Sequence, residues 1–299
     1  MTSSHMYLKN REGEHDFDIP KDWYQHREPG ISGLLRVYNE EEWIGPCIES
    51  MLPFVDELII TYECTDRTKK IIDSFNSKKI KAYEYPFYIG EVDGTSNPDS
   101  VHDRAYYSNW SLSLTKYQIV GKWDADMIML NKFYKCRDMV LNLNLTRLRG
   151  YNIVNLDPLL LSKTEPIFHD EPRFYKINKY MYFVQAADSE KKLYKSVAPK
   201  AKIDVLFFDR AGVPKYHRPR EWLETPPWFH YYRLWGILTK KDINLKEPMF
   251  IHTKFVKKNV KYYIHEPDRE NLIFEPGEKL NIYVPECLFK KPEDYLKGR

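Results

Sequence analysis

Hydrophobic positions in the first third of the chain alternate between short apolar runs and stretches with helical spacing. The run 31–38 follows Pro29-Gly30 and is typical of a buried parallel strand. Between Trp43 and Leu52 apolar residues recur at i, i+4 and i+8, which predicts a helix with one buried face. We expect Asn39 to be the N-cap of this helix, with Glu40, Glu41 and Glu42 in its first turn.

The same alternation continues to residue 85. Strands are predicted at 57–62 and 80–85, with a helix at 69–75 between them. Strand, helix, strand, helix and strand at this spacing predict an α/β fold with a parallel sheet. Ligands of such sheets bind beyond the carboxyl ends of the strands. Polar side chains that follow predicted strands are Asn39, Glu63, Asp66, Asp124 and Asp126.

Two carboxylates one residue apart, Asp124 and Asp126, follow the apolar run 119–121. Residues i and i+2 of a strand point to the same face, so both carboxylates can converge on one divalent cation where the strand ends. Mg²⁺ and Mn²⁺ prefer oxygen ligands and often share them with phosphate groups. The pair therefore predicts a nucleotide-phosphate site, although a single Asp-x-Asp is more often a solvated turn.

Length and composition agree with a soluble enzyme. The 299 residues are 42% hydrophobic and 30% charged, and no apolar run approaches the roughly 20 residues that span a bilayer. No signal peptide is predicted, so we expect a cytoplasmic protein. Four scattered cysteines, without metal-ligand spacing, are expected to be reduced thiols. Residues 1–30 form a predicted N-terminal arm whose first five residues resemble a cloning remnant.

Four separated elements together resemble the family 2 glycosyltransferases of GT-A fold. They are Arg36-Val-Tyr-Asn39-Glu40-Glu41, Cys64-Thr65-Asp66-Arg67-Thr68, Ser108-Asn109 and Asp124-Ala125-Asp126. The resemblance covers about a third of the chain. It implies a Rossmann-like fold with a mixed central sheet, and transfer of a hexose or pentose, with inversion, from a nucleotide diphosphate sugar, expected to be a UDP-sugar, with Mn²⁺ or Mg²⁺. Residues 31–133 would form the donor half and 134–299 the acceptor half of one compact unit.

The resemblance also implies roles for individual residues. Asp126 would contact the metal, and Asp124 would reach the ribose or a metal-bound water. Glu63 stands with Tyr62 where the family usually has an aspartate that meets the base, and Ser108-Asn109 replaces the usual Arg-Asn pair, with Arg104 a turn earlier. Asp66 is favoured as a cap of the following helix. The predicted donor-binding residues are Arg36, Tyr38, Asn39, Glu63, Asp66, Arg104, Asn109 and Asp124.

Assignments in the second half of the chain follow from residue type. His230 is a candidate third metal ligand, since imidazole binds manganese. Candidate general bases, needed to deprotonate the acceptor hydroxyl, are Asp170, Glu171 and Asp188. Candidate acceptor-binding residues are Trp228, Tyr231, Arg233 and Trp235.

The acceptor itself has two predicted classes. A glycan or lipid-linked glycan is the family's commonest acceptor. A modified base in DNA is the alternative, as in phage DNA glycosyltransferases, because Lys and Arg residues are interleaved with aromatic residues between His230 and Tyr263. A nucleotide-sugar binding module without catalysis is the non-enzymatic alternative.

Overall fold

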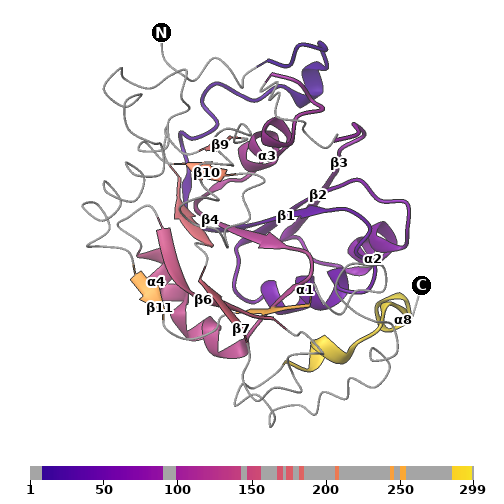
Figure 1. The fold of residues 1–299 in the computed structure, drawn as a ribbon, viewed down its shortest axis with the longest axis vertical. Coiled ribbons are helices and arrows are strands. Elements are labelled where there is room, and N and C mark those ends of the chain that lie inside the picture. The colour runs from indigo at the N-terminus through magenta and orange to yellow at the C-terminus, as the bar shows by residue number, and fades with distance from the viewer. Residues whose placement is uncertain are drawn as a thin grey trace. The chain divides into compact units, whose positions relative to one another are not determined.

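The computed structural model describes residues 9–89, 99–142, 147–155, 167–170, 173–177, 182–184, 206–208, 243–245, 250–253 and 285–297 (Figure 1). The chain divides into two compact units, each assembled from three stretches of sequence. The larger unit draws on residues 28–85, 117–176 and 242–299, and the smaller one on 1–27, 86–116 and 177–241. These units cut across the predicted donor and acceptor halves, and that functional division stays a prediction.

The larger unit contains a ten-stranded mixed sheet with the order β3-β2-β1-β4-β8-β6-β12-β5, while β7 and β11 also pair with β6. Strands β1 to β4 are mutually parallel, whereas β8 runs antiparallel to β4. The predicted α/β class with a mixed central sheet is confirmed. The strands are β1 (Glu28–Val37), β2 (Glu57–Tyr62), β3 (Ile80–Glu84), β4 (Tyr117–Asp124), β5 (Met127–Met129), β6 (Arg147–Asn155), β7 (Ile167–Asp170), β8 (Phe174–Lys176), β11 (Ile243–Leu245) and β12 (Phe250–His252).

Helices connect the parallel strands as the sequence predicts. The α-helices of this unit are α1 (Ile44–Met51), α2 (Thr68–Ser74), α4 (Arg137–Leu141) and α8 (Pro292–Leu296), and the 3-10 helices are η3 (Asn131–Cys136) and η9 (Glu286–Phe289). Helix α1 joins β1 to β2, and α2 joins β2 to β3. The predicted strand-helix-strand-helix-strand unit is therefore confirmed, with element ends shifted by a few residues.

The predicted start of the first helix is wrong. Helix α1 begins at Ile44 rather than after Asn39, and its N-cap position is held by Trp43. Asn39 has a φ of 48°, in the left-handed region that asparagine tolerates better than most residues, and this conformation cannot begin a helix. The backbone N–H of Trp43 and of Ile44 both donate to the carbonyl oxygen of Glu40, so the three glutamates form a turn before α1.

The main cluster of the hydrophobic core lies on one face of the parallel strands, while Leu34, Ile59 and Val120 are buried on the other face. Leu35 of β1, Ile60 of β2 and Trp123 of β4 lie on three neighbouring strands, belong to this cluster and are fully buried. The Trp123 ring meets those of Phe174 and Phe250 edge to face, with centroids 5.2 and 5.7 Å apart. Because strand residues alternate between faces, burial of Trp123 directs Lys122 and Asp124 to the opposite face of β4.

The C-terminal segment packs on the helices of this unit. A Cβ atom on Gly45 of α1 would lie 2.4 Å from the Tyr295 ring of α8, so this contact requires glycine. The Tyr295 hydroxyl and the Lys290 ammonium both donate to the carboxylate of Glu49, at 3.0 and 2.7 Å. The last described residues of the chain are thereby joined to helix α1.

The smaller unit contains η2 (His15–Phe17), α3 (Arg104–Ser113) and a two-stranded antiparallel sheet of β9 (Tyr182–Val184) and β10 (Leu206–Phe208). Asp103 caps α3, because its carboxylate accepts hydrogen bonds from the N–H groups of Ala105 and Tyr106. Among the described residues of the chain, no helix is both long and apolar enough to cross a membrane.

Candidate active site at the carboxyl edge of the sheet

The predicted donor-site residues of the larger unit gather where β1, β2 and β4 end. Arg36 near the end of β1 is in register with Thr61 of β2 on one side and with Asp124 of β4 on the other. Asn39 follows β1, and Glu63 follows β2. In-register residues of parallel strands share a face, so Arg36 and Asp124 lie side by side on the face opposite the core.

The two aspartates occupy different structural positions. Asp124 is the last residue of β4, and its side chain is 43% exposed. Asp126 is buried in the turn between β4 and β5. Its carbonyl oxygen accepts two hydrogen bonds from Thr253, one from the backbone N–H and one from the hydroxyl, each 2.9 Å long. The turn is therefore fixed by a residue 127 positions further along the chain.

A buried thiol lies beneath the aspartate pair. The Sγ atom of Cys47 on α1 is 3.8 Å from the carbonyl oxygen of Asp124. Burial raises the pKa of the Cys47 thiol well above its ordinary value, and the negative charges of Asp126 and Asp124 raise that pKa further. The thiol is therefore neutral at physiological pH, and both carboxylates lie close enough to affect it.

The residues present fit a hard divalent cation. Asp124 and Asp126 supply carboxylate oxygens at the end of a strand, as Mg²⁺ and Mn²⁺ prefer. Within the described residues, no group of three or more His, Cys, Asp or Glu side chains could hold a metal ion. A cation here would complete its coordination with phosphate oxygens or water, the usual arrangement for Mg²⁺ beside a nucleotide.

One charged residue near this pair was missed by sequence reasoning. Arg173 immediately precedes β8, and its Nη1 atom lies 3.4 Å from Oδ2 of Asp124. Its side chain is only 2% exposed. An arginine before a short strand carries no local signal, because only the pairing of β8 with β4 brings it to Asp124.

Tyr38 and Asn39 shape the loop that follows β1. Tyr38 is 63% exposed, which is unusual for a large ring at the end of a buried strand. The side chain of Asn39 accepts a hydrogen bond from the Thr65 N–H at 2.8 Å and donates one to the Thr65 hydroxyl at 3.1 Å. These bonds join the loop after β1 to the loop after β2, which also contains Glu63.

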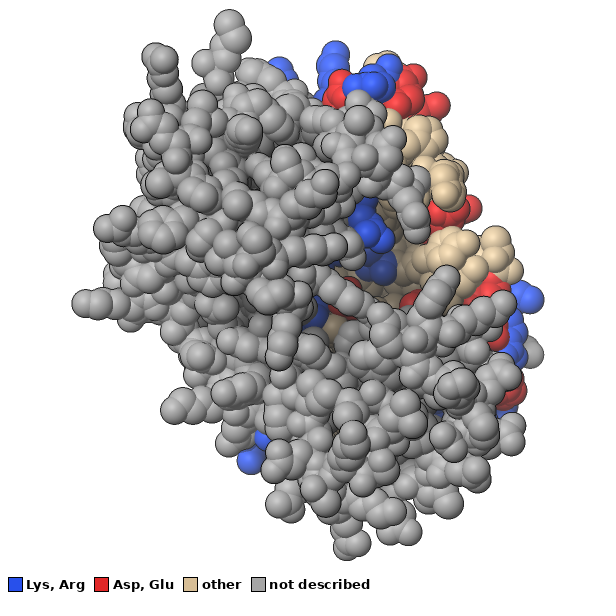
Figure 2. Space-filling view, viewed as in Figure 1, with Lys and Arg blue, Asp and Glu red and all other residues tan. Residues whose placement is uncertain are grey.

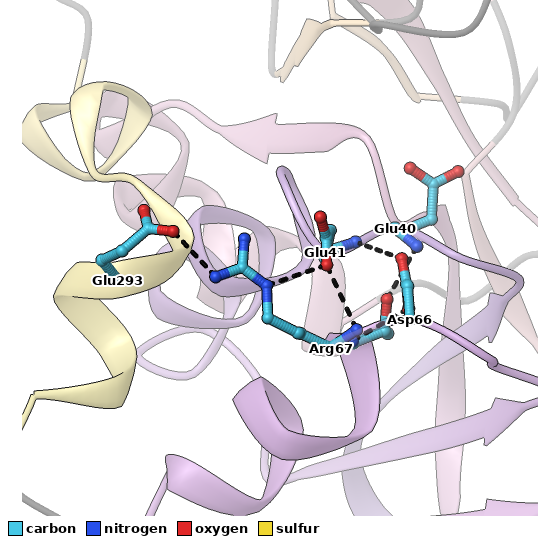
Figure 3. A network of polar contacts seen from close by, with 6 residues as sticks. Glu40, Glu41, Asp66, Arg67 and Glu293 are labelled. Atoms are coloured by element: carbon cyan, nitrogen blue, oxygen red, sulfur yellow. Dashed lines mark hydrogen bonds and ion pairs between the residues drawn. The ribbon is translucent and has the colours of Figure 1, made fainter.

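A polar network fixes the same two loops from the side of α8 (Figure 3). The Asp66 carboxylate accepts hydrogen bonds from the N–H groups of Thr68, at 2.9 Å, and Glu41, at 3.2 Å. Arg67 forms ion pairs with Glu41, at 3.0 Å, and with Glu293 of α8, at 2.8 Å. Asp66 does not hold the N-cap position of α2, which belongs to Arg67, but its carboxylate does accept from the N–H of Thr68, the first residue of the helix. Its role in donor binding stays a prediction.

Two predicted donor residues, Arg104 and Asn109, lie on α3 in the smaller unit. Arg104 is the exposed first residue of the helix. Asn109 is buried, and its side-chain amide bonds the Phe183 backbone in β9 twice, accepting from the N–H at 2.7 Å and donating to the carbonyl oxygen at 2.8 Å. These bonds give Asn109 a structural role, while a donor contact stays a prediction for both residues.

The remaining predicted site residues lie mainly outside the described residues. Asp170 ends β7, and only its backbone is described. The candidates outside are Glu171, Asp188, Trp228, His230, Tyr231, Arg233 and Trp235, together with residues 254–261 of the basic and aromatic stretch between His230 and Tyr263. On the described surface that faces the viewer in Figure 2, Lys and Arg side chains are interspersed with Asp and Glu side chains.

No protein-family model and no curated protein matches this sequence. Distant similarity to solved structures is found, including S. aureus TarS, with 14% identity and a TM-score of 0.39, covering 75% of this chain and 36% of that one. A second is glucosyl-3-phosphoglycerate synthase from Mycobacterium tuberculosis, in complex with Mn²⁺, UDP and glucosyl-3-phosphoglycerate. It has 15% identity and a TM-score of 0.39, covering 77% of this chain and 73% of that one. A third is mannosyltransferase PcManGT from Pyrobaculum calidifontis, in complex with GDP-Man and Mn²⁺. It has 15% identity and a TM-score of 0.40, covering 80% of this chain and 60% of that one. This chain thus spans about a third of the length of TarS, and similarity at this level assigns no activity to it.

Proposed function

We propose that this protein is a metal-dependent glycosyltransferase of GT-A type that moves a sugar from a nucleotide diphosphate sugar to an acceptor hydroxyl, with inversion. The observation that carries the proposal is the placement of Asp124 and Asp126 at the carboxyl end of β4, with Arg36 in register beside Asp124. Two carboxylates and a guanidinium at the carboxyl edge of parallel strands match the chemistry of a metal-bound diphosphate.

Each residue of this edge has a role in the proposal. Asp126 binds the cation directly, and Asp124 binds the ribose or a metal-bound water. Arg36 faces the diphosphate, whose charge it complements. The exposed Tyr38 ring offers a stacking surface for the base, and Glu63 accepts a hydrogen bond from the base or ribose. When bound, the cation would stabilise the negative charge that develops on the departing nucleoside diphosphate.

Inversion requires a base on the acceptor side. Asp170, Glu171 and Asp188 remain the predicted candidates for deprotonating the acceptor hydroxyl. A glycan or lipid-linked glycan is the proposed acceptor, bound by the aromatic residues between Trp228 and Trp235. DNA remains the predicted alternative. Retention on DNA that weakens as salt rises would favour it, because neutralised phosphates release counterions.

Release of nucleoside diphosphate from a panel of UDP- and GDP-sugars tests the proposal, with and without Mn²⁺ and with chelator. At least one donor is expected to be hydrolysed slowly in Mn²⁺ without an acceptor, and chelator is expected to abolish the reaction. Asp126→Asn is expected to remove most of the activity while leaving the melting temperature of the protein unchanged. Full activity in chelator would contradict the metal assignment, and donor binding without any turnover would favour a binding module.

A further inference from the structure

The strand order places Arg173 beside Asp124 of the proposed metal site. Phe174 of β8 pairs with Gly121 of β4 and packs on Trp123 at the core face of the sheet. Alternation along the strand therefore turns Arg173 to the opposite face, the one that carries Asp124. The Lys122 N–H donates to the Arg173 carbonyl oxygen at 2.9 Å, which fixes the arginine next to the end of β4.

The exposures of the two side chains differ sharply. Arg173 is 2% exposed and Asp124 is 43% exposed, with 3.4 Å between Nη1 and Oδ2. The same Nη1 atom lies 3.5 Å from the carbonyl oxygen of Lys122. A guanidinium retains its charge when buried, so Arg173 contributes one fixed positive charge behind the carboxylate. Its burial keeps it from touching a bound donor, and any effect on the donor acts through Asp124.

We propose that Arg173 is a positioning residue of the metal site, holding Asp124 and making metal binding depend on the nucleotide. This inference rests on the proposed function. Asp124 and Asp126 alone carry two negative charges and would attract a bare divalent cation strongly, whereas Arg173 reduces this charge by one. A complex of Mn²⁺ with UDP carries net negative charge, so the same arginine favours it. Arg173 thus weakens binding of the metal alone and strengthens binding of the metal–diphosphate complex.

The test measures binding of Mn²⁺ to the full chain by electron paramagnetic resonance, without and with UDP. Arg173→Met is expected to tighten binding of Mn²⁺ alone roughly tenfold and to weaken binding of the Mn²⁺–UDP complex several-fold. The two affinities are expected to change in opposite directions, whereas structural damage would weaken binding of both Mn²⁺ alone and Mn²⁺–UDP. Met approximates the length of Arg, and the exposed Asp124 can be solvated, so the variant is expected to fold. Arg173→Gln, which keeps an amide donor, is the second variant and is expected to behave alike.

Two controls isolate the proposed pairing. Arg137 contacts Asp56 through Nη2 at 2.7 Å to both carboxylate oxygens, near the start of β1 and away from the aspartate pair. Arg137→Met therefore removes another Arg–Asp pair and is expected to leave both affinities unchanged. In an Asp124→Asn background, Arg173→Met is expected to lose most of its effect, because the two residues act on the metal together.

Two results would be adverse, and they are distinguishable. The first adverse result is that the parent protein binds Mn²⁺–UDP but Arg173→Met and Arg173→Gln leave both affinities unchanged. An effect of these variants that is equally large in the parent and in the Asp124→Asn background would count in the same way. Either outcome would show that Arg173 has no positioning role. The proposed function then still stands. If the parent binds no Mn²⁺ even with UDP, GDP or their sugars, the proposed function itself fails.

Discussion

Thr253 donates two hydrogen bonds of 2.9 Å to the carbonyl oxygen of Asp126, one from its backbone N–H and one from its hydroxyl. Thr253 directly follows β12, which pairs antiparallel with β5 just beyond the Asp126 turn. The backbone of the second aspartate is thus held by a residue that lies 127 positions away in the sequence.

Thr253→Val tests this relationship, because valine keeps the size of threonine but lacks the hydroxyl. The variant is expected to lose about 1 kcal/mol of unfolding free energy, the usual value of one hydrogen bond, measured by urea denaturation. Its affinity for Mn²⁺–UDP is expected to fall several-fold, and Thr253→Ser is expected to restore it. Ser111→Ala removes another buried hydroxyl that donates to a carbonyl oxygen, at 2.8 Å, and serves as control. A loss of metal affinity in Ser111→Ala would show that the effect is not specific.

Tyr38 is the predicted stacking surface for the nucleotide base. Tyr38→Ala is expected to weaken nucleotide binding about tenfold, since stacking of a base on an aromatic ring contributes roughly 1–3 kcal/mol. Tyr38→Phe should bind as the parent does. Tyr88 is similarly exposed, at 71% against 63% for Tyr38, and Tyr88→Ala is the matched control. Equal losses from the two alanine variants, measured by calorimetric titration, would refute a stacking role for Tyr38.

The contact between Arg67 and Glu293 predicts that acid loosens α8. The hydrogen bond from Arg67 holds the pKa of the Glu293 carboxyl below its ordinary value of 4.5, and Lys297 lowers the pKa of Asp294 in the same way. A lowered pKa in the folded state contributes stability that is fully present above the ordinary value and is lost as pH falls through the folded one. The protection factors of the amides in 292–296, relative to the intrinsic exchange rate at each pH, are therefore expected to fall as pH drops below 4.5, before those in β1 and β4 do.

Glu293→Gln is expected to accelerate the exchange of 292–296 at pH 7, where Glu293 pairs with Arg67 in the parent. Lys69→Met serves as control, because Lys69 pairs with Asp73 within α2 and does not contact α8 through that pair. Unchanged exchange in Glu293→Gln at pH 7 would mean that packing of Tyr295 on Gly45, rather than the ion pair, holds the helix.

The parallel strands and the aspartate pair were predictable because they depend on local signals. The apolar run 57–62 forms β2 as expected, and Asp124 ends β4 where its carboxylate was expected to lie. Asn39 shows the limit of such signals. Asparagine suits both a helix N-cap and a left-handed turn, and its bonds to Thr65 decide in favour of the turn.

Arg173 and Thr253 could not be predicted as neighbours of the aspartates. Neither belongs to a motif, and each reaches the site through a strand pairing, β8 with β4 and β12 with β5. Short three-residue strands carry little periodicity, so their partners and register are decided by tertiary packing. Likewise, the contact of Glu293 with Arg67 joins positions 226 residues apart.

The central claim is that Asp126 holds a divalent cation against a nucleoside diphosphate. Calorimetric titration of UDP and GDP, each with Mn²⁺, into the parent and into Asp126→Asn tests it most directly, with Asp138→Asn of α4 as an exposed control. We predict that the parent and Asp138→Asn bind at least one nucleotide only when Mn²⁺ is present, and that Asp126→Asn loses this binding. Equal Mn²⁺-dependent binding by Asp126→Asn, or no binding of either nucleotide by the parent, would contradict the account.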